Sequence, residues 1–336
     1  MKLKLGMTVQ LIAIAFASGL CGTAQAQTIL KFSHTDQLQS ERQAGAQIFA
    51  KKVADYTQNR YKVNVFCCAS LGSDPKNIEQ LVSGGIDFTV SSTGSYAPHV
   101  DTLNLAMLPF MFESFEQGWK WYDSSKWLKA QFDKAPAKGF RFLSTWESGF
   151  RCMTTKEALN SPADAKGKKL RSFPNEMMRW LLEDIGFGVQ IMPLPEVYLA
   201  IQQGSVAGQE NPIEMIHSMK FYEVAPYLTL TRHVYSPLPL AISEKTWQKL
   251  SAQDQKAITR AAEEAGAWNR SEVMANEGRQ LADMASKGAK ISTPELEPFR
   301  DAVKPTYERA KAKWGSDVDL ILAEAAAIRK ALPVQK

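Results

Sequence analysis

The early part of the chain switches between the hydrophobic spacing of a strand and that of a helix. Residues 61–68 (YKVNVFCC) alternate between two sets of side chains, which predicts a strand, and residues 28–34 (TILKFSH) predict another. Residues 40–59 lie between them and predict a helix. Its apolar stripe consists of Ile48, Phe49, Val53 and Tyr56.

A second helix and a third strand follow. In residues 71–85 (LGSDPKNIEQLVSGG), Asp74 is a good N-cap, Pro75 suits the first helical position, and Gly84-Gly85 predicts the end of the helix. Residues 86–92 (IDFTVSS) then predict a strand. Strand, helix, strand, helix, strand is the pattern of a parallel, doubly wound sheet.

The same pattern recurs later in the chain. Strands are predicted at 140–146, 149–155, 168–173 and 188–192, helices within 172–186 and 195–204, and a short extended segment at 205–210. Asn211-Pro212 is predicted to begin another helix, and from Glu244 onward the chain is mostly helical.

We therefore expect an α/β protein of two doubly wound lobes, with a ligand cleft between them and hinge crossings that let them close. Lobe I is predicted to contain residues 27–148 and about 237–276. Lobe II is predicted to contain residues 149–236 and about 277–336.

Residues 1–26 have the features of a secretory signal peptide. Lys2 and Lys4 precede an apolar run, and a small-residue cleavage site (Ala24-Gln25-Ala26) precedes Gln27. The run is short for a membrane span of about 20 residues, although an N-terminal anchor is the alternative. Secretion predicts a periplasmic protein.

The charge of the chain favours a small anionic ligand over a nucleic acid. Removing Lys2 and Lys4 takes the net charge from +5 to +3, and no basic stripe with interleaved aromatic residues follows. Motifs for dinucleotides, for the P-loop, for a nucleophile elbow and for zinc are missing from the sequence. The histidines are scattered, at His34, His99, His217 and His233. These observations predict a binding protein without a metal or cofactor, rather than an enzyme.

Three cysteines remain after the signal peptide. Adjacent cysteines pair poorly with each other, so a disulfide would join Cys152 to Cys67 or to Cys68. The alternative is three thiols that act as small hydrophobic residues.

Arg171 is the leading candidate for a ligand contact. Three lysines, Lys166, Lys168 and Lys169, lead into its predicted strand, whereas Arg171 ends that strand beside a helix start. Ligands of open α/β sheets bind outside the carboxyl ends of strands, and helix amino termini there add positive potential. The planar arginine fork can bind both oxygens of a carboxylate. A solvated arginine is the alternative.

Other candidates each have a structural alternative. Arg151 alternates with apolar neighbours in its strand, and His34 ends the first strand. Asn211 is either a ligand contact or the cap of the helix that begins at Pro212. Trp146 is either a ring platform or part of the core, and Glu147 either accepts hydrogen bonds from hydroxyl groups or is exposed.

Several longer stretches resemble a known family. They are VFCCASLGSDPKNIEQLVSGGIDFTVSS, GFR, SPADAKGKKLRSFPNEMMRWLLEDIGFGVQIMPLPEVYLAIQQGSVAGQENP and FYEVAPYLTLTRHVYSP. In order and spacing they resemble the DctP-type periplasmic solute receptors of tripartite ATP-independent periplasmic (TRAP) transporters. The resemblance covers essentially the whole chain after the signal peptide.

The resemblance implies roles for individual residues. Arg171 would form a salt bridge with the ligand carboxylate, Arg151 would be a second basic contact, and Asn211 would orient the ligand. His34 matches a position that faces the cleft, and Ser91 and Ser92 fall where the third strand delivers a polar contact.

The sequence also departs from the family pattern at three places. Leu194 replaces a common aromatic ring, Ala207 replaces an aspartate, and the Cys67-Cys68 pair is unusual. Leu194 affects the expected size and shape of the ligand.

The resemblance also implies a partner. We expect a monomer that delivers a small carboxylate to TRAP permease subunits, without being embedded in the membrane itself. The polar candidates favour a sugar acid, such as a uronate or an aldonate. Another carboxylate (a dicarboxylate or 2-oxo acid), a secreted enzyme acting on organic acids, and a sensory partner of a membrane receptor are the alternatives.

Overall fold

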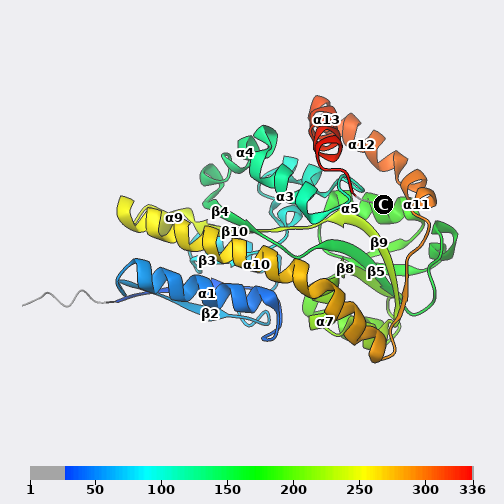
Figure 1. Ribbon diagram of the computed structural model, residues 1–336, viewed down its shortest axis with the longest axis horizontal. Coiled ribbons are helices and arrows are strands. Elements are labelled where there is room, and N and C mark those ends of the chain that lie inside the picture. The colour runs from blue at the N-terminus through cyan, green and yellow to red at the C-terminus, as the bar shows by residue number, and fades with distance from the viewer. Residues whose placement is uncertain (1–26, 335–336) are drawn as a thin grey trace, which may run out of the picture.

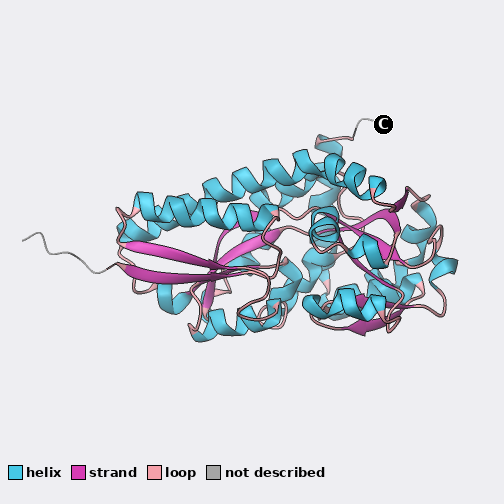
Figure 2. Ribbon diagram, turned by 90° about the horizontal axis from the view of Figure 1, so that it is seen from below, coloured by secondary structure: helices cyan, strands magenta, loops and turns pink. Residues whose placement is uncertain are grey.

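The computed structural model describes residues 27–334 as two α/β lobes, each built on its own sheet (Figure 1). The two sheets lie at opposite ends of the elongated molecule, with helices packed around each (Figure 2). This arrangement confirms the predicted fold class. The predicted signal peptide lies outside the described residues.

The sheet of lobe I has the strand order β2-β1-β3-β10-β4. β1 pairs in parallel with β2 and β3, as the sequence predicts, whereas β10 runs antiparallel to β3 and β4. The strands are β1 (Thr28–Ser33), β2 (Tyr61–Phe66), β3 (Phe88–Val90), β4 (Phe140–Trp146) and β10 (Leu238–Ser243).

The sheet of lobe II has the order β11-β9-β5-β8-β6-β7 and is also mixed. β6 is parallel to β7 and β8, while β5 is antiparallel to β8 and β9. The strands are β5 (Phe150–Thr155), β6 (Lys169–Ser172), β7 (Gly188–Ile191), β8 (Gly208–Pro212), β9 (Tyr227–Tyr235) and β11 (Lys290–Ser292). β9, β10 and β11 are not predicted from the sequence.

Helices cover both sheets and dominate the chain after Glu244, as predicted. The α-helices are α1 (Glu41–Tyr56), α2 (Asp74–Ser83), α3 (Phe115–Ser124), α4 (Lys126–Phe132), α5 (Glu176–Ile185), α6 (Val197–Gln202), α7 (Ile213–Ser218), α8 (Phe221–Val224), α9 (Glu244–Trp247), α10 (Ala252–Ser286), α11 (Glu297–Ala302), α12 (Lys304–Trp314) and α13 (Ser316–Ala331). Short 3₁₀ helices are η1 (Thr93–Tyr96), η2 (Asp101–Met107), η3 (Pro136–Lys138), η4 (Pro162–Ala165) and η5 (Leu194–Glu196).

Two predicted helix starts are wrong by one residue. Ser73 precedes α2 with an extended backbone, so Asp74 is the first helical residue rather than the cap. Asn211 belongs to β8, and α7 begins after Pro212. Neither side chain caps a helix, and both border the space between the lobes.

The chain crosses between the lobes at residues 147–149, at residues 236–237 and along α10. α10 packs against α1 and β4 in lobe I and against α7 and β11 in lobe II, and it runs the length of the molecule in Figure 1. At the C-terminal end, α12 packs against α5, while α13 packs against α3 and α4. The C-terminal helices therefore contact both lobes, α12 the elements of lobe II and α13 those of lobe I. The predicted lobe boundaries near residues 148, 237 and 277 stay a proposal.

The predicted cysteine pairing is wrong. The disulfide joins Cys67 to Cys68, and Cys152 is a free, buried thiol in the sheet of lobe II. β2 ends at Phe66, so the chain has already left the strand where neighbouring side chains point to opposite faces. Cys68 and Ala69 have positive φ angles of 60° and 56°, and this turn allows the adjacent sulfur atoms to meet.

Candidate functional site

Two adjoining cavities lie between the lobes. One, of about 30 Å³, is lined by Arg42, Ser92, Arg151 and Asn211, and we name it the inner cavity. The other, of about 120 Å³, is lined by His99, and we name it the outer cavity. Both are bordered by Asp74, Ser95, Arg171, Phe173 and Leu194. Direct bonds join the lobes around them, such as Ser218 Oγ to Asp36 Oδ1 at 2.9 Å. Of the nine side chains that the sequence nominates, five line these cavities: Arg151, Arg171, Asn211, Ser92 and Leu194.

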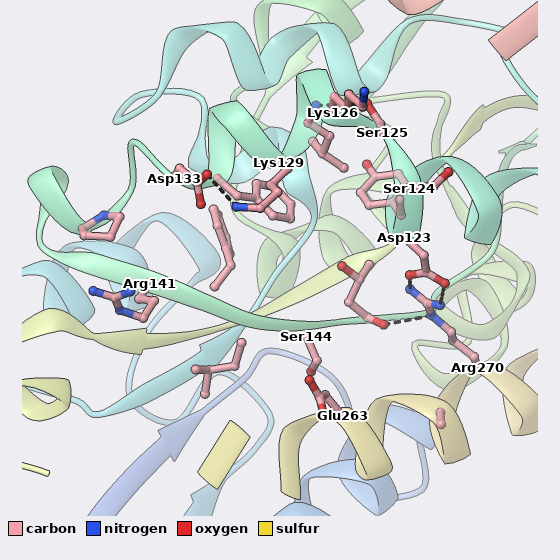
Figure 3. Close-up of a pocket in the computed structure, with 18 residues that line it drawn as sticks. Asp123, Ser124, Ser125, Lys126, Lys129, Asp133, Arg141, Ser144, Glu263 and Arg270 are labelled. Atoms are coloured by element: carbon pink, nitrogen blue, oxygen red, sulfur yellow. Dashed lines mark hydrogen bonds and ion pairs between the residues drawn. The ribbon is translucent and has the colours of Figure 1, made fainter. Parts of the chain in front are cut away.

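A larger groove of about 850 Å³ lies within lobe I, between α3, α4, β4 and α10 (Figure 3). Two of its cationic side chains are already neutralised. Arg270 makes a two-nitrogen contact with Asp123 at 2.8 and 2.9 Å, and Lys129 lies 2.7 Å from Asp133. The groove thus lacks the buried, converging arginines that distinguish the cleft between the lobes.

Arg171 lies near the carboxyl end of β6, as the sequence predicts, and is 2 % exposed. Its Nε and Nη2 atoms both donate to the carbonyl oxygen of Met192, at 3.0 and 2.8 Å. Burial lowers its pKa to about 10, while Glu210 opposes this change, so the guanidinium stays charged at neutral pH. Within residues 27–334, Nη1 has no hydrogen-bond acceptor. The main chain therefore fixes the fork and leaves one of its nitrogens free toward the cavities.

Arg151 is largely committed to contacts within the protein. It forms a buried salt bridge with Glu210 through Nε, and its Nη2 donates to Glu210 Oε1 and to Asn211 Oδ1, both at 3.0 Å. Its Nη1 has only a 3.4 Å contact with Ser236 Oγ. The guanidinium also lies 5.1 Å from the centre of the Phe173 ring. Arg151 thus lines the inner cavity with most of its donors occupied.

Glu210, which the sequence does not nominate, contacts Arg151, Ser172 and His233. Burial alone would raise its pKa, but the charge of Arg151 and hydrogen bonds from His233 and Arg151 lower it to about 2. Glu210 also accepts a bond from Ser172 Oγ at 3.0 Å. The sequence shows Glu210 only as an acidic residue next to Asn211 in an extended segment. Its partner, Arg151, lies 59 residues earlier in the chain, so the pair cannot be recognised from neighbouring residues.

Two other polar residues differ in their access to the cavities. Ser92 lines the inner cavity, and its Oγ lies 3.3 Å from Ser236 Oγ. Ser91 does not line either cavity, and its Oγ donates to Asp74 Oδ1 at 2.9 Å. Asp74 itself borders both cavities and was proposed from the sequence only as a helix cap. Ser91 thus contributes by holding Asp74.

Glu147 and Trp146 are buried and line neither cavity, so a ligand contact for either residue stays a prediction. The Glu147 carboxylate accepts four hydrogen bonds, from Tyr235 Oη and Trp119 Nε1 at 2.6 Å and from the main-chain nitrogens of Gly149 and Ser148 at 2.7 and 2.9 Å. It is 1 % exposed, and it ties the first lobe crossing to the end of β9. Trp146 is fully buried in the core of lobe I and fills the space between α1 and α10.

His34 lies just beyond β1 but does not line either cavity. Its Nε2 atom is 2.8 Å from Gln43 Oε1, and its ring packs edge-on against Phe32. Burial and the nearby charge of Arg42 lower its pKa to about 4. A direct ligand contact for His34 stays a prediction.

The lowered pKa of His34 predicts a pH-dependent stability. Between about pH 6.5 and 4 the unfolded chain binds a proton at His34 that the folded chain does not, so this group lowers stability as the pH falls. From pH 7 to pH 5 the contribution is about 2 kcal/mol. We expect His34→Gln to reduce the difference in unfolding free energy, measured by urea denaturation at both pH values. An identical pH dependence in both proteins would exclude His34 as its source.

Arg42 also lines a cavity, although the sequence does not nominate it. It is 2 % exposed and reaches the inner cavity from α1. A signal was available, because Arg42 shares the buried face of α1 with Gly45, Ala46, Phe49 and Val53. A charged residue on an apolar stripe is unusual and indicates a specific role.

Residues 32–313 match the family model described as DctP, bacterial extracellular solute-binding protein, family 7. This chain belongs to the DctP family. The family consists of solute-binding proteins and not of enzymes, and it serves TRAP transport systems.

Relatives of this DctP chain can be aligned with it over nearly its full length. The sialic acid-binding periplasmic protein SiaP of Vibrio cholerae is 31% identical over 313 residues, which cover 93% of this chain and 97% of SiaP. A TRAP periplasmic solute-binding protein from Polaromonas sp. JS666, bound to D-erythronate, is 34% identical with a TM-score of 0.85. That match covers 92% of this chain and 100% of the Polaromonas chain.

A third relative is the sugar acid binding protein DctPAm from Advenella mimigardefordensis, in complex with galactonate. It is 31% identical with a TM-score of 0.87, and the match covers 90% of this DctP chain and 99% of DctPAm. The two solved structures match both lobes, and so the fold of this chain is that of the TRAP solute-binding proteins.

The described part of this DctP protein shows neither a membrane-spanning helix nor a metal site. None of the helices in residues 27–334 combines the length and apolar character needed to cross a bilayer. The same residues contain no group of three or more His, Cys, Asp or Glu side chains placed to hold a metal ion.

Proposed function

We propose that this protein is a periplasmic receptor that captures a small organic acid and delivers it to the membrane permease of a TRAP transporter. The observation that carries the proposal is Arg171, a buried cation at the junction of both cavities, with its fork fixed by the Met192 carbonyl. A planar guanidinium in this setting is well suited to a carboxylate. Arg151 supplies a second positive charge, and Asn211 orients the ligand.

A sugar acid is the ligand class that the site favours. Asp74, Ser92, Ser95 and Asn211 border the cavities and can exchange hydrogen bonds with hydroxyl groups. Two related structures hold D-erythronate and galactonate, which are hydroxylated acids. A dicarboxylate is less suited, because its second carboxylate would meet the negative charge of Asp74.

Binding is proposed to involve closure of the two lobes. Ligand pockets for drug-sized molecules typically have volumes of about 300–1,000 Å³, and the two cavities are far smaller than this. We expect the lobes to separate to admit the acid and then to close around it, with the crossings acting as the hinge. The N-terminal signal peptide would place this event in the periplasm.

A thermal-shift screen over an organic-acid library tests the proposed function. A receptor gains stability from its ligand by mass action, so sugar acids should raise the melting temperature more than dicarboxylates or 2-oxo acids. Chromatography of the incubated acid should recover it unchanged. A larger shift with succinate than with galactonate, D-erythronate or D-glucuronate would contradict the sugar-acid assignment, and absence of any shift with carboxylates would contradict the receptor assignment.

A further inference from the structure

Arg42 is a buried cation whose hydrogen-bonding capacity is largely unused. Its Nη1 atom lies 3.4 Å from Thr35 Oγ1, and its Nε atom lies 3.5 Å from Asp36 Oδ2 without hydrogen-bond geometry. A guanidinium carries five N–H donors. Among the described residues, the long contact to Thr35 is the one hydrogen bond that the Arg42 side chain makes.

The other two arginines of the cleft differ from Arg42 in this respect. Arg171 donates twice to Met192, and Arg151 donates to Glu210, Asn211 and Ser236. Leaving buried donors without acceptors costs about 1–3 kcal/mol each, and more for a charged group. A buried arginine in this condition, at the wall of a cavity, is suited to oxygen atoms supplied from outside the chain.

The charges around the inner cavity indicate whether the oxygen atoms that Arg42 would bind belong to a carboxylate or to a hydroxyl group. Burial, followed by the charge of Asp36, raises the pKa of Glu214 well above its usual range. Apart from Glu214, the basic and acidic side chains at or beside the inner cavity are equal in number, three of each: Arg42, Arg151, Arg171, Asp36, Asp74 and Glu210. A monocarboxylate adds one net negative charge to this buried space and a dicarboxylate adds two, which is costlier.

Hydroxyl oxygens satisfy the donors of Arg42 without adding charge. A hydroxyl group can accept from Arg42 and at the same time donate to a carboxylate such as Asp74, which shares the inner cavity. Arg42 and Asp74 belong to lobe I, whereas Arg151 and Arg171 belong to lobe II. A hydroxylated acid would thus be held from both lobes at once.

We propose that Arg42 is a ligand-binding residue that donates hydrogen bonds from lobe I to hydroxyl oxygens of the acid whose carboxylate Arg171 holds in lobe II. This inference rests on the proposed function and adds to it the residue that selects hydroxylated monocarboxylates. It also gives the ligand a part in closure, because the same molecule bonds to both lobes.

The test compares Arg42→Gln with the unchanged protein by calorimetry, using whichever of D-erythronate, galactonate and D-glucuronate binds most tightly. We expect affinity for that acid to fall at least tenfold at a temperature where the variant is still folded. The melting temperature without ligand should also fall, because Asp36 loses its buried counter-charge. Arg42→Lys should weaken binding less. Lys51→Gln, which removes an exposed charge from the same helix, is the matched control and should bind as the unchanged protein does.

Two outcomes would overturn the role of Arg42 and leave the receptor assignment intact, and a third would overturn the sugar-acid assignment as well. If the unchanged protein binds a sugar acid and Arg42→Gln binds it equally well, Arg42 is not a ligand contact, although the receptor assignment stands. If Arg42→Gln melts at a lower temperature without ligand and keeps its affinity, Arg42 is structural, and the inference is again overturned. If the unchanged protein binds no sugar acid, both the sugar-acid assignment and the role of Arg42 fail.

Discussion

Replacing Arg171 with alanine is expected to lower the affinity for the carboxylate ligand by about two to three orders of magnitude. Truncating one partner of a buried, hydrogen-bonded charge pair costs about 2–5 kcal/mol, and each tenfold change in affinity is about 1.4 kcal/mol. Arg171 meets this condition because it is 2 % exposed and charged at neutral pH. Calorimetric titration with the acid identified by the thermal-shift screen provides the measurement.

Two variants make the Arg171 result specific. Arg171→Lys keeps the positive charge but cannot donate through a planar fork, so binding should also weaken. Lys169→Ala removes a charge two residues earlier in β6, where the side chain is exposed, and affinity should be retained. Unchanged affinity in Arg171→Ala would exclude the carboxylate clamp.

Replacing Glu210 with alanine is expected to destabilise the folded protein by about 3–5 kcal/mol. The change leaves the Arg151 guanidinium buried without its counter-charge, and it also removes an acceptor for Ser172. Burial makes this loss much larger than that of a surface ion pair. Denaturation by urea at neutral pH measures the change in unfolding free energy.

The pH dependence of the Glu210 effect has a defined direction. The folded pKa of Glu210 is about 2, below its usual value of 4.5. Its contribution to stability is therefore full above about pH 4.5 and disappears as the pH falls toward 2. The difference between the unchanged protein and Glu210→Ala should shrink in the same range.

Two further variants control the Glu210 experiment. Glu157→Ala removes an exposed partner of Lys168 and should change stability by less than about 1 kcal/mol. Replacing both members of the buried pair, as Arg151→Met with Glu210→Leu, should cost less than the sum of the two single changes. Additive losses, or a Glu210→Ala protein as stable as its parent, would show that the pair does not stabilise the fold.

Features set by neighbouring residues were predictable from the sequence. Alternation and turn residues located β1, β2, β4, β5, β6 and β7, and the position of Arg171 at a strand end followed from the same local signals. The two-lobe architecture followed from the recurrence of strand and helix. These features depend on spacing within about twenty residues, and a single sequence contains that information.

Features set by distant partners were not predictable in this way. Whether Glu147 faces solvent depends on Tyr235, which lies 88 residues later, and the pairing of Arg151 depends on Glu210. The predicted N-caps of α2 and α7 are each wrong by one residue. The residues Asp-Pro and Asn-Pro indicate that a helix begins nearby, but they do not fix which residue is the N-cap. Arg42 could have been found from its place on an apolar helical face.

The carbonyl of Met192, which fixes Arg171, lies two residues before Leu194, which borders both cavities. One short segment therefore contains both the carbonyl that orients Arg171 and a side chain that forms part of the wall of both cavities. Exchanging the side chain at position 194 would reshape the wall and leave the anchor in place, whereas inserting or deleting a residue in this segment would displace both. If the proposed function holds, we expect point substitution at position 194 to change which length of acid the protein prefers.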